Sequence, residues 1–502
     1  MGVGAALAVV FTLGDPGITI DEPLDVGPGQ RYIAALFKHG THFFDRAVVD
    51  RVFADNAEHP PLGRWLLGIA STLGGPFDPL LGGPDPFGVH AGRLAPALCF
   101  AALVALVALV AGRRFGRAGG IAAGLALMFM PRMFAHAHFG ALDTFLCLFW
   151  TAALLAVGLA LERKRPVLAM AGAGLVWGLA LLTKIHAWLL PPIALVWVLV
   201  RLPWKRGLVA ILAWGAAGFA LFLVAWPWLW YDTAARLSAY LGTGVDRLSL
   251  RVFYFGQVYA DRDVPWHYPW VYFAVTVPVG LHLLGVNGLI RAWRLRKADP
   301  FPLLLTAPIG MFLALFSTNV PVYDGERLFL VVFPFWALLI GLGFQVIWTW
   351  LAGRRWCRAA LIGFVLAQGW GVVSTHPFGL SYFNILIGGL PGAERLGLEL
   401  TYWGDAIDPV LLDNLARRTQ PGEVVALVPT LHHLQGVAAT TPALLDLGIT
   451  LQDESEAPRA DWVLVYRRTA YWRPEIAALT RAPAVASRRR QGVWLSGLWH
   501  RH

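Results

Sequence analysis

The stretch LAPALCFAALVALVALVAGRR, residues 94–114, decides the fold of this chain. Residues 94–112 carry no charge, and about 20 such apolar residues are what an α-helix needs to cross the hydrocarbon core of a bilayer. Arg113 and Arg114 follow at once. Because basic residues are retained on the cytoplasmic side, the stretch indicates a membrane span that ends inside the cell.

The same arrangement recurs along the 502 residues, which are 57% hydrophobic and only 14% charged. No soluble core needs that much apolar surface, so the composition predicts a polytopic α-helical membrane protein. We expect about eleven spans, with the N terminus inside and the C terminus outside. They lie near residues 1–14, 94–112, 118–135, 141–161, 166–183, 185–200, 207–230, 269–290, 300–318, 328–352 and 357–373.

Every second connection between these spans carries a basic cluster, and the clusters begin at Arg113, Arg163, Arg201, Arg291 and Arg354. The connections between them are poor in Lys and Arg but hold Asp21, Glu22, Glu58, Asp143 and Glu326. The positive-inside rule therefore places the carboxylates on the outer side. It also explains the net charge of +10 better than a nucleic-acid partner does, so the expected partner is the bilayer.

The chain divides into two predicted domains. Residues 1–373 form a transmembrane domain, whose long outer loops 15–93 and 231–268 suggest short helices at the membrane surface around a cavity. Residues 374–502 contain short β-like runs at 424–428, 462–466 and 493–499 and a helical stretch near 408–418. We expect a soluble outer α/β domain of ordinary size. The three cysteines fall in or beside spans, so no disulfide framework is expected.

Two polar motifs stand out in the first outer loop. Asp21 and Glu22 are adjacent carboxylates at a membrane surface, which is costly unless they have partners or a task. The sequence EHPPLGR at 58–64 contains two prolines that would hold Glu58 and His59 rigidly before a half-helix. Taken singly, each motif has a structural explanation: the carboxylates could be a solvated acidic pair, and EHPPLGR could be a turn stiffened by its prolines.

Together, these motifs resemble a known family. An Asp-Glu pair followed about forty residues later by HPPLG and a basic residue is similar to the protein O-mannosyltransferases. The Glu before the two prolines is similar to the aminoarabinose transferases that act on lipid A, although those carry Lys where this chain has His59. Both groups are C-type membrane glycosyltransferases. The resemblance continues through PRMFAHAHFGALD (131–143), GLALLTK (178–184), GERLFLVVFP (325–334), YFNILIGGLPGA (382–393) and WGD (403–405).

The resemblance implies a multi-pass enzyme of the bacterial inner membrane, with its active site and C-terminal domain on the outer face. Its donor would be a polyprenyl-phosphate sugar, and its acceptor a hydroxyl of a lipid, a glycan or a protein. Such a reaction needs one carboxylate to accept the acceptor proton and cations to stabilise the departing phosphate. No cofactor is required.

The residues present can fill these roles. Asp21 is the candidate base, and Glu22, Glu58 and Asp143 would shape the sugar and acceptor pocket. For the phosphate we favour Arg327, whose planar fork suits bidentate contact, with Lys184 second. His59 stands where the aminoarabinose transferases carry Lys, which makes its phosphate contact an open question. Both Arg327 and Lys184 could instead extend to the lipid headgroups.

A metal site is a weaker prediction. His136 and His138 precede Asp143 closely, and clustered carboxylates suit a divalent cation. However, an H-x-H pair is a weak signal, and no C-x-x-C or H-E-x-x-H motif accompanies it. We expect the two histidines to line a polar cavity.

Two other classes of function remain as alternatives. A transporter or flippase of a lipid-linked glycan would also need polar groups near a membrane cavity, but it should carry ionisable residues deep within its spans. A non-catalytic scaffold of the same fold would need no ordered base. It would be indicated if Asp21 pointed away from the cavity.

Overall fold

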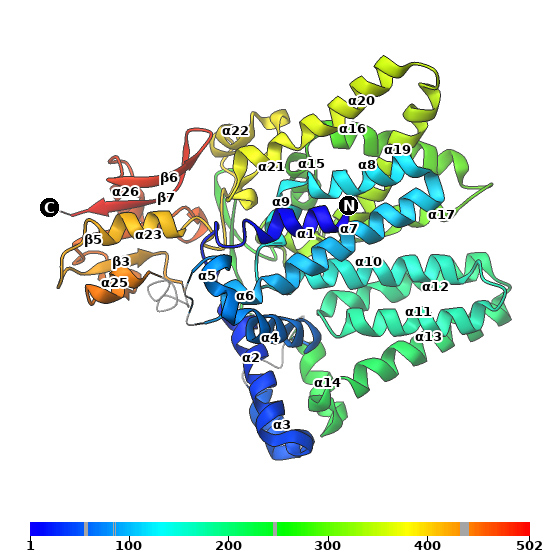
Figure 1. Ribbon diagram of the computed structural model, residues 1–502, viewed down its shortest axis with the longest axis horizontal. Helices are drawn as coiled ribbons and strands as arrows, with labels where there is room; N and C mark the ends of the chain where they lie inside the picture. The colour runs from blue at the N-terminus through cyan, green and yellow to red at the C-terminus, as the bar shows by residue number, and fades with distance from the viewer. Residues whose placement is uncertain (55–58, 84, 86, 244–247, 432–440, 502) are drawn as a thin grey trace.

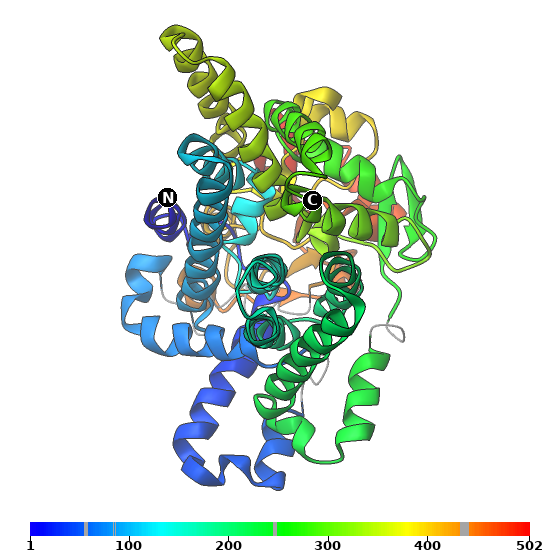
Figure 2. The same ribbon diagram turned by 90° about the vertical axis from the view of Figure 1, so that its right-hand side faces the viewer.

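The computed structural model describes residues 1–501, except 55–58, 84, 86, 244–247 and 432–440. A bundle of helices makes up most of the molecule, and a small sheet domain lies at one end of it (Figure 1). Figure 2 views the opposite end, from which several helices of the bundle run toward the viewer. The predicted class, a helical membrane protein with a C-terminal α/β domain, is confirmed in outline.

Within the described residues, five helices are long and apolar enough to cross a membrane. Each coincides with a predicted span, because an uninterrupted apolar run can satisfy its backbone polar groups in lipid only as a helix. They are α7 (Leu94–Phe115, which extends a candidate span that begins at Val89), α10 (Asp143–Ala160), α13 (Trp204–Val224), α19 (Val332–Trp350), and α20 (Arg355–Gln368) continued by α21 (Trp370–Thr375).

The other predicted spans are shorter or broken. The prediction for 1–14 is wrong in extent, because α1 covers only Gly2–Val10, about 14 Å at 1.5 Å per residue. The prediction for 269–290 is wrong in shape, because α15 (Tyr268–Thr276) and α16 (Val279–Leu295) meet at 113°. Pro278 lies at that break, where it fixes φ and removes a backbone donor.

Four further predicted spans are shorter apolar helices, so the count of eleven stays a prediction. These are α8 (Arg117–Met128), followed by α9 (Pro131–His136); α11 (Pro166–Leu181); η3 (Ile185–Leu189) with α12 (Leu190–Arg201); and α17 (Phe301–Leu304) with α18 (Thr306–Leu315).

The first outer loop is mostly helical, as predicted. It contains α2 (Glu22–His39), η1 (Gly40–Phe44), α3 (Arg46–Val52), α4 (Leu62–Gly74), η2 (Gly75–Phe77), α5 (Asp78–Leu81) and α6 (Val89–Gly92). Helices α2 and α4 cross with their backbones in contact at Gly29 and Gly68. A Cβ added at Gly29 would lie 2.2 Å from the carbonyl oxygen of Arg64, so only glycine allows this approach.

The second outer loop differs from its prediction. It contains α14 (Thr233–Gly242), which follows η4 (Pro227–Trp230) at the end of the predicted span, but then an antiparallel hairpin of β1 (Arg251–Tyr254) and β2 (Gln257–Ala260). The hairpin turn uses Phe255 and Gly256, both with positive φ. A glycine there makes such a turn possible.

The sheet domain holds five strands in the order β4-β3-β5-β7-β6. Strands β3 (Val425–Val428), β4 (Leu451–Gln452) and β5 (Trp462–Tyr466) are parallel, whereas β6 (Ala486–Arg490) and β7 (Val493–His500) are antiparallel. Helices α23 (Pro409–Ala416), α25 (Pro442–Asp446) and α26 (Pro474–Leu479) accompany it. The three predicted strands and the predicted helix near 408–418 are therefore confirmed.

The segment between the last span and the sheet packs against the bundle. It contains η6 (Gly379–Ser381), η7 (Ile385–Ile387) and α22 (Gly389–Arg395). Phe378, Phe383 and Leu390 belong to the same buried core as the membrane helices. Val493 and Leu495 of β7 belong to it too, so the sheet domain is joined to the bundle by a packed apolar contact as well as by the chain.

Candidate active site

The segment that carries Asp21 is fixed by the start of the C-terminal region. The backbone N–H of Gly17 donates to the carbonyl of Asp405 (2.8 Å), and that of Ile20 donates to the carbonyl of Trp403 (3.1 Å). The WGD motif therefore forms backbone hydrogen bonds with the residues that lead into helix α2. Asp21 lies directly before that helix, with its side chain 25% exposed.

Arg327 is the centre of the site. It begins η5 (Arg327–Phe329), and its guanidinium stacks over the ring of Trp403 at 4.3 Å. Its Nε donates to Oδ2 of Asp143 (3.2 Å), its Nη1 to Oδ2 of Asp324 (3.2 Å) and its Nη2 to the carboxylate of Asp21. Three carboxylates from distant parts of the chain therefore converge on one cation.

Asp143 joins this cluster to a second cation. It is the first residue of α10, and its Oδ1 accepts a hydrogen bond from Nζ of Lys184 at 2.7 Å. Lys184 follows α11 in an extended conformation and is 6% exposed. The ion pairs thus run from Lys184 through Asp143 and Arg327 to Asp21. Four of the residues that the sequence singles out therefore lie in one series of ion pairs.

A cavity of about 590 Å³ opens beside Lys184. Its polar side chains include Lys184, His59 and His186, whereas most of the remaining lining is apolar: Ile185, Trp188, Leu189, Leu241, Leu248, Leu250, Leu315, Phe316, Val320, Pro321 and Leu328, together with Thr243 and Tyr323. Leu241 and Leu248 are exposed, so one side of the lining is continuous with the molecular surface. The cavity could hold an apolar chain whose anionic end meets Lys184.

His59 contributes a neutral imidazole to this cavity. Burial lowers its pKa well below the usual histidine value, and the positive charges of Arg64, Lys184 and Arg327 lower it further. Its Nδ1 is buried and has no hydrogen-bond partner within the described part of the chain. Leu62 holds the HPPLG segment in place, because its N–H donates to the carbonyl of Leu182 at 2.9 Å. Glu58 lies outside the described residues.

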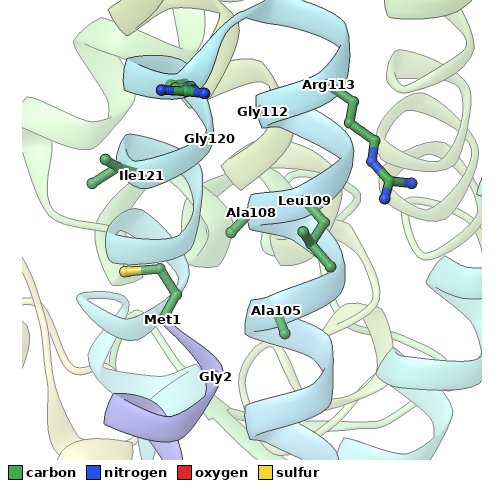
Figure 3. Close-up of a pocket in the computed structure, with 10 residues that line it drawn as sticks. Met1, Gly2, Ala105, Ala108, Leu109, Gly112, Arg113, Gly120 and Ile121 are labelled. Carbon is green, nitrogen blue, oxygen red and sulfur yellow. The ribbon is translucent and has the colours of Figure 1, made fainter.

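A second cavity of similar volume, about 580 Å³, lies elsewhere between α1, α7 and α8 (Figure 3). Its lining is made of small and apolar residues with two arginines: Met1, Gly2, Ala105, Ala108, Leu109, Gly112, Arg113, Arg117, Gly120 and Ile121. None of these could act as a general base. The candidate active site is therefore the carboxylate cluster beside Lys184.

Glu22 has a different environment from Asp21. It is fully buried, and its two oxygens accept from Nε and Nη2 of Arg93 (2.7 and 2.8 Å) and from the N–H groups of Gly140 and Thr19 (both 2.7 Å). Burial raises its pKa, but the Arg93 pair and these hydrogen bonds outweigh burial and leave the pKa below the usual value. Both carboxylate oxygens of Glu22 are therefore fully occupied by hydrogen bonds within the protein, which favours a structural role.

We expect Glu22→Gln to lower the stability of the protein. The amide would leave the buried Arg93 charge uncompensated, and breaking a buried ion pair in this way costs about 3–5 kcal/mol. Thermal unfolding of the detergent-solubilised protein measures the effect. Glu162→Gln is the matched control, because the Glu162–Arg114 pair is partly exposed and such pairs are worth about 0–1 kcal/mol. Equal unfolding temperatures for the two variants would contradict a structural role for Glu22.

The two histidines of the weakly predicted metal site, His136 and His138, have different hydrogen-bond partners. His138 hydrogen-bonds the hydroxyl of Thr12 (2.8 Å) and the carbonyl of Phe134 (2.9 Å), so both ring nitrogens are engaged. His136 lies 3.4 Å from the hydroxyl of Tyr402 and packs edge-on against Trp403. No group of three potential metal ligands occurs in the described ranges.

Sequence reasoning missed three members of the site. Asp324 was not singled out, although the pair Asp324-Gly325 before ERLF is a recognisable turn. Asp25 lies one helical turn after Asp21 and pairs with Nε of Arg64 at 3.1 Å; burial, opposed by Arg64, raises its pKa to about 6. Arg468, from the sheet domain, donates to Oδ1 of Asp324 at 3.0 Å. No sequence signal marked Arg468.

Comparison with known proteins places this geometry in context. Residues 58–231 match the family described as dolichyl-phosphate-mannose-protein mannosyltransferase. No curated protein matches the chain. Among solved structures, ArnT from Cupriavidus metallidurans in the apo state has a TM-score of 0.55 at 18% identity, over 99% of this chain and 97% of that one.

Two further structures are less similar. ArnT from Cupriavidus metallidurans bound to undecaprenyl phosphate has a TM-score of 0.48 at 16% identity, over 99% of this chain and 97% of that one. The oligosaccharyltransferase AglB from Archaeoglobus fulgidus, with an inhibitory peptide and a dolichol-phosphate, has a TM-score of 0.45 at 13% identity, over 93% and 69%. The family match and the fold shared with apo ArnT confirm the resemblance of this chain to the C-type membrane glycosyltransferases.

Proposed function

We propose that this protein transfers a sugar from a polyprenyl-phosphate donor to an acceptor hydroxyl at the outer face of the membrane. The observation that carries the proposal is the convergence of Asp21, Asp143, Lys184 and Arg327, from four separate segments, beside an apolar cavity. The family that matches residues 58–231 is named for a sugar carried on a polyprenyl phosphate, which supports the same donor class.

The cavity suits such a donor. Its apolar lining would take the first units of the prenyl chain, and the exposed Leu241 and Leu248 leave a way in from the surrounding lipid. The phosphate would meet the ammonium of Lys184, which makes one hydrogen bond to the described residues and carries three donors. His59, kept neutral, would add an N–H donor without adding charge.

The residue that we propose for binding the phosphate differs from the one that the sequence favours. Arg327 was favoured for the phosphate because of its planar fork, but all three of its nitrogens already donate to carboxylates. Two of its five N–H groups remain, but a phosphate bound through them would lie beside those three negative charges. We therefore propose Lys184 as the principal phosphate ligand and Arg327 as the group that organises the carboxylates.

Asp21 is the proposed general base. It is the most exposed of the three carboxylates around Arg327, at 25% against 3% for Asp143 and 6% for Asp324, so an acceptor can reach it. As the acceptor oxygen bonds to the anomeric carbon, its proton passes to Asp21, the bond from that carbon to the phosphate oxygen breaks, and polyprenyl phosphate leaves. Lys184 would stabilise the charge on the leaving group.

The basic clusters support the proposed outer orientation. Arg113, Arg163, Arg201, Arg291 and Arg354 begin clusters in alternate connections, which the positive-inside rule assigns to the cytoplasm. The site and the sheet domain then lie outside, as expected for a bacterial inner-membrane enzyme that modifies the cell envelope. The acceptor would be a lipid, a glycan or a protein on that side.

A reconstituted assay tests this function. The purified protein in liposomes receives a polyprenyl-phosphate sugar labelled in the sugar, together with envelope lipids or secreted proteins as acceptors. We expect label to move to an acceptor and free polyprenyl phosphate to appear in equal amount. Movement of the intact donor between leaflets, with no polyprenyl phosphate released, would favour the transporter instead. If the donor neither moves between leaflets nor loses its sugar to any class of acceptor, the result would favour a scaffold.

A further inference from the structure

We propose that Arg468, from the sheet domain, is a positioning residue that neutralises Asp324 and thereby keeps Arg327 paired with Asp21. The proposal gives the outer domain a part in setting the charge of the site. Its chemical consequence rests on the proposed function, in which Asp21 is the base. The charge linkage itself can be measured without any transfer reaction.

The fold delivers Arg468 to the site from the end of a buried strand. All five residues of β5 are buried between β3 and β7, and Arg468 follows that strand by two residues. Ligand-binding residues of parallel sheets commonly follow the carboxyl ends of strands. Here, the end of β5 faces the membrane domain, so Arg468 reaches the carboxylate cluster.

The guanidinium of Arg468 is fixed on both sides. Its Nη1 donates to the carbonyl of Tyr402 at 2.6 Å, and its Nη2 donates to Oδ1 of Asp324 at 3.0 Å. The next two backbone N–H groups, those of Thr469 and Ala470, donate to the carboxylate of Glu399 at 2.7 and 2.9 Å. Arg468 is therefore held at a defined distance from Asp324, and it is buried from water.

The carboxylate of Asp324 forms ion pairs with two arginines. Its Oδ1 accepts from Arg468 and its Oδ2 accepts from Arg327. The turn that carries it has positive φ at Asp324 and Gly325, and the N–H of Gly325 donates to the hydroxyl of Tyr268 at 3.0 Å. Glu326, next in the chain, is paired with Arg132 at 2.6 Å. The turn is thus held on several sides, so Asp324 has little freedom to move away if Arg468 is lost.

The cluster is balanced only when Arg468 is counted. Three carboxylates, Asp21, Asp143 and Asp324, face three cations, Arg327, Lys184 and Arg468. Asp143 also has Lys184 and Asp324 also has Arg468, whereas Arg327 is the sole ion-pair partner of Asp21 in the part of the chain described. Without Arg468, the full charge of Asp324 would compete for Arg327, and Asp21 would bind a proton more readily.

Other titratable groups near the cluster must be followed in the test. Those that face Asp21, Asp324 or Arg327 are Asp25, His59, His136, Asp143, Tyr268, Tyr323, Glu326, Tyr402 and Tyr466. Burial raises the pKa of Tyr402 and Tyr466, so these hydroxyls stay neutral. Asp25, whose pKa lies at about 6, titrates in the range of interest and must be read separately.

Carbodiimide labelling reads each carboxyl separately. A water-soluble carbodiimide with glycinamide modifies protonated carboxyls, and peptide mass spectrometry of the full-length protein gives the labelling midpoint of Asp21 and of Asp25. We expect Arg468→Gln to raise the Asp21 midpoint by about one pH unit, as loss of support from one nearby opposite charge would do. Arg467→Gln is the matched control, since the neighbouring Arg467 pairs with Glu394 instead; it should leave the midpoint unchanged.

Two further variants make the test specific. Asp324→Asn alone should lower the Asp21 midpoint, because one competitor for Arg327 is removed, and this result is obtained even if Arg468→Gln does not fold. Adding Asp324→Asn to Arg468→Gln restores the charge balance and should return the midpoint to the wild-type value. A purely structural role predicts no such rescue, because the double variant loses both sides of the contact.

The outcomes separate the two proposals. Equal midpoints for Arg468→Gln and Arg467→Gln, or no shift in Asp324→Asn, would overturn the positioning role. If the variants show the expected labelling shifts but the wild-type protein transfers no sugar, only the proposed function would be refuted. Where transfer is observed, the acidic limb of its kcat/KM profile should move with the Asp21 midpoint.

Discussion

Asp21→Asn should lower the rate of sugar transfer by about 10²–10⁴-fold, which is the usual contribution of a general base. The amide keeps the size of the side chain and can still accept a hydrogen bond from Arg327, but it cannot take the proton of the acceptor. Initial rates of transfer from a polyprenyl-phosphate sugar, measured on the purified variant, give the effect. The binding of the donor should change little, because Asp21 does not contact the cavity that would hold it.

The matched control is Asp45→Asn. Asp45 lies in the same outer loop but is exposed and pairs with His42. It should transfer at the wild-type rate. If Asp21→Asn also transferred at close to the wild-type rate, Asp21 would not be the base, and Asp25 and Asp143 would be the next carboxylates to test, together with Glu58.

Lys184→Ala should have the second largest effect. Removing one donor that stabilises developing negative charge in a dry site costs about 10²–10³-fold in kcat. Lys184→Arg should retain more activity, because the positive charge remains. Single-turnover rates and donor affinity are measured for both, with Lys164→Ala, in the basic connection of residues 163–165, as the control.

The same experiment decides between the two candidate phosphate ligands. Arg327 is engaged by three carboxylates, so Arg327→Lys should disturb the base more than the binding of the donor. Donor affinity should therefore fall in Lys184→Ala and change less in Arg327→Lys. The reverse result, with normal donor affinity in Lys184→Ala and weak binding in Arg327→Lys, would return the phosphate to Arg327.

The spans were predictable because lipid leaves the backbone few choices. Runs such as those of α7, α10 and α19 must be helical wherever water cannot satisfy their amide groups. What the hydropathy could not show is where a run is interrupted. The 113° break at Pro278 and the short α1 depend on how neighbouring segments pack, although the proline itself was visible.

The candidate site was predictable in part for a similar reason. Four residues of the site each lie where an apolar run meets a polar segment: Asp21, Asp143, Lys184 and Arg327. Such boundaries on one side of a membrane lie at a similar depth. Asp324 and Arg468 carry no comparable mark. Arg468 reaches Asp324 only through the register of β5 in its sheet, and a contact between residues 144 positions apart in the chain has no local pattern.

The long-range origin of the site also bears on the order of synthesis. Its residues are drawn from positions 21, 143, 184, 327 and 468, so it spans nearly the whole chain. A ribosome delivers these positions one after another, and the last of them emerges when the bundle has already been inserted. Asp21, Lys184, Arg327 and the lining of the cavity beside Lys184 all precede Arg468 in the chain. A chain cut short by translational arrest before β5 would therefore carry these groups without Arg468, the residue that we propose balances the charge of Asp324.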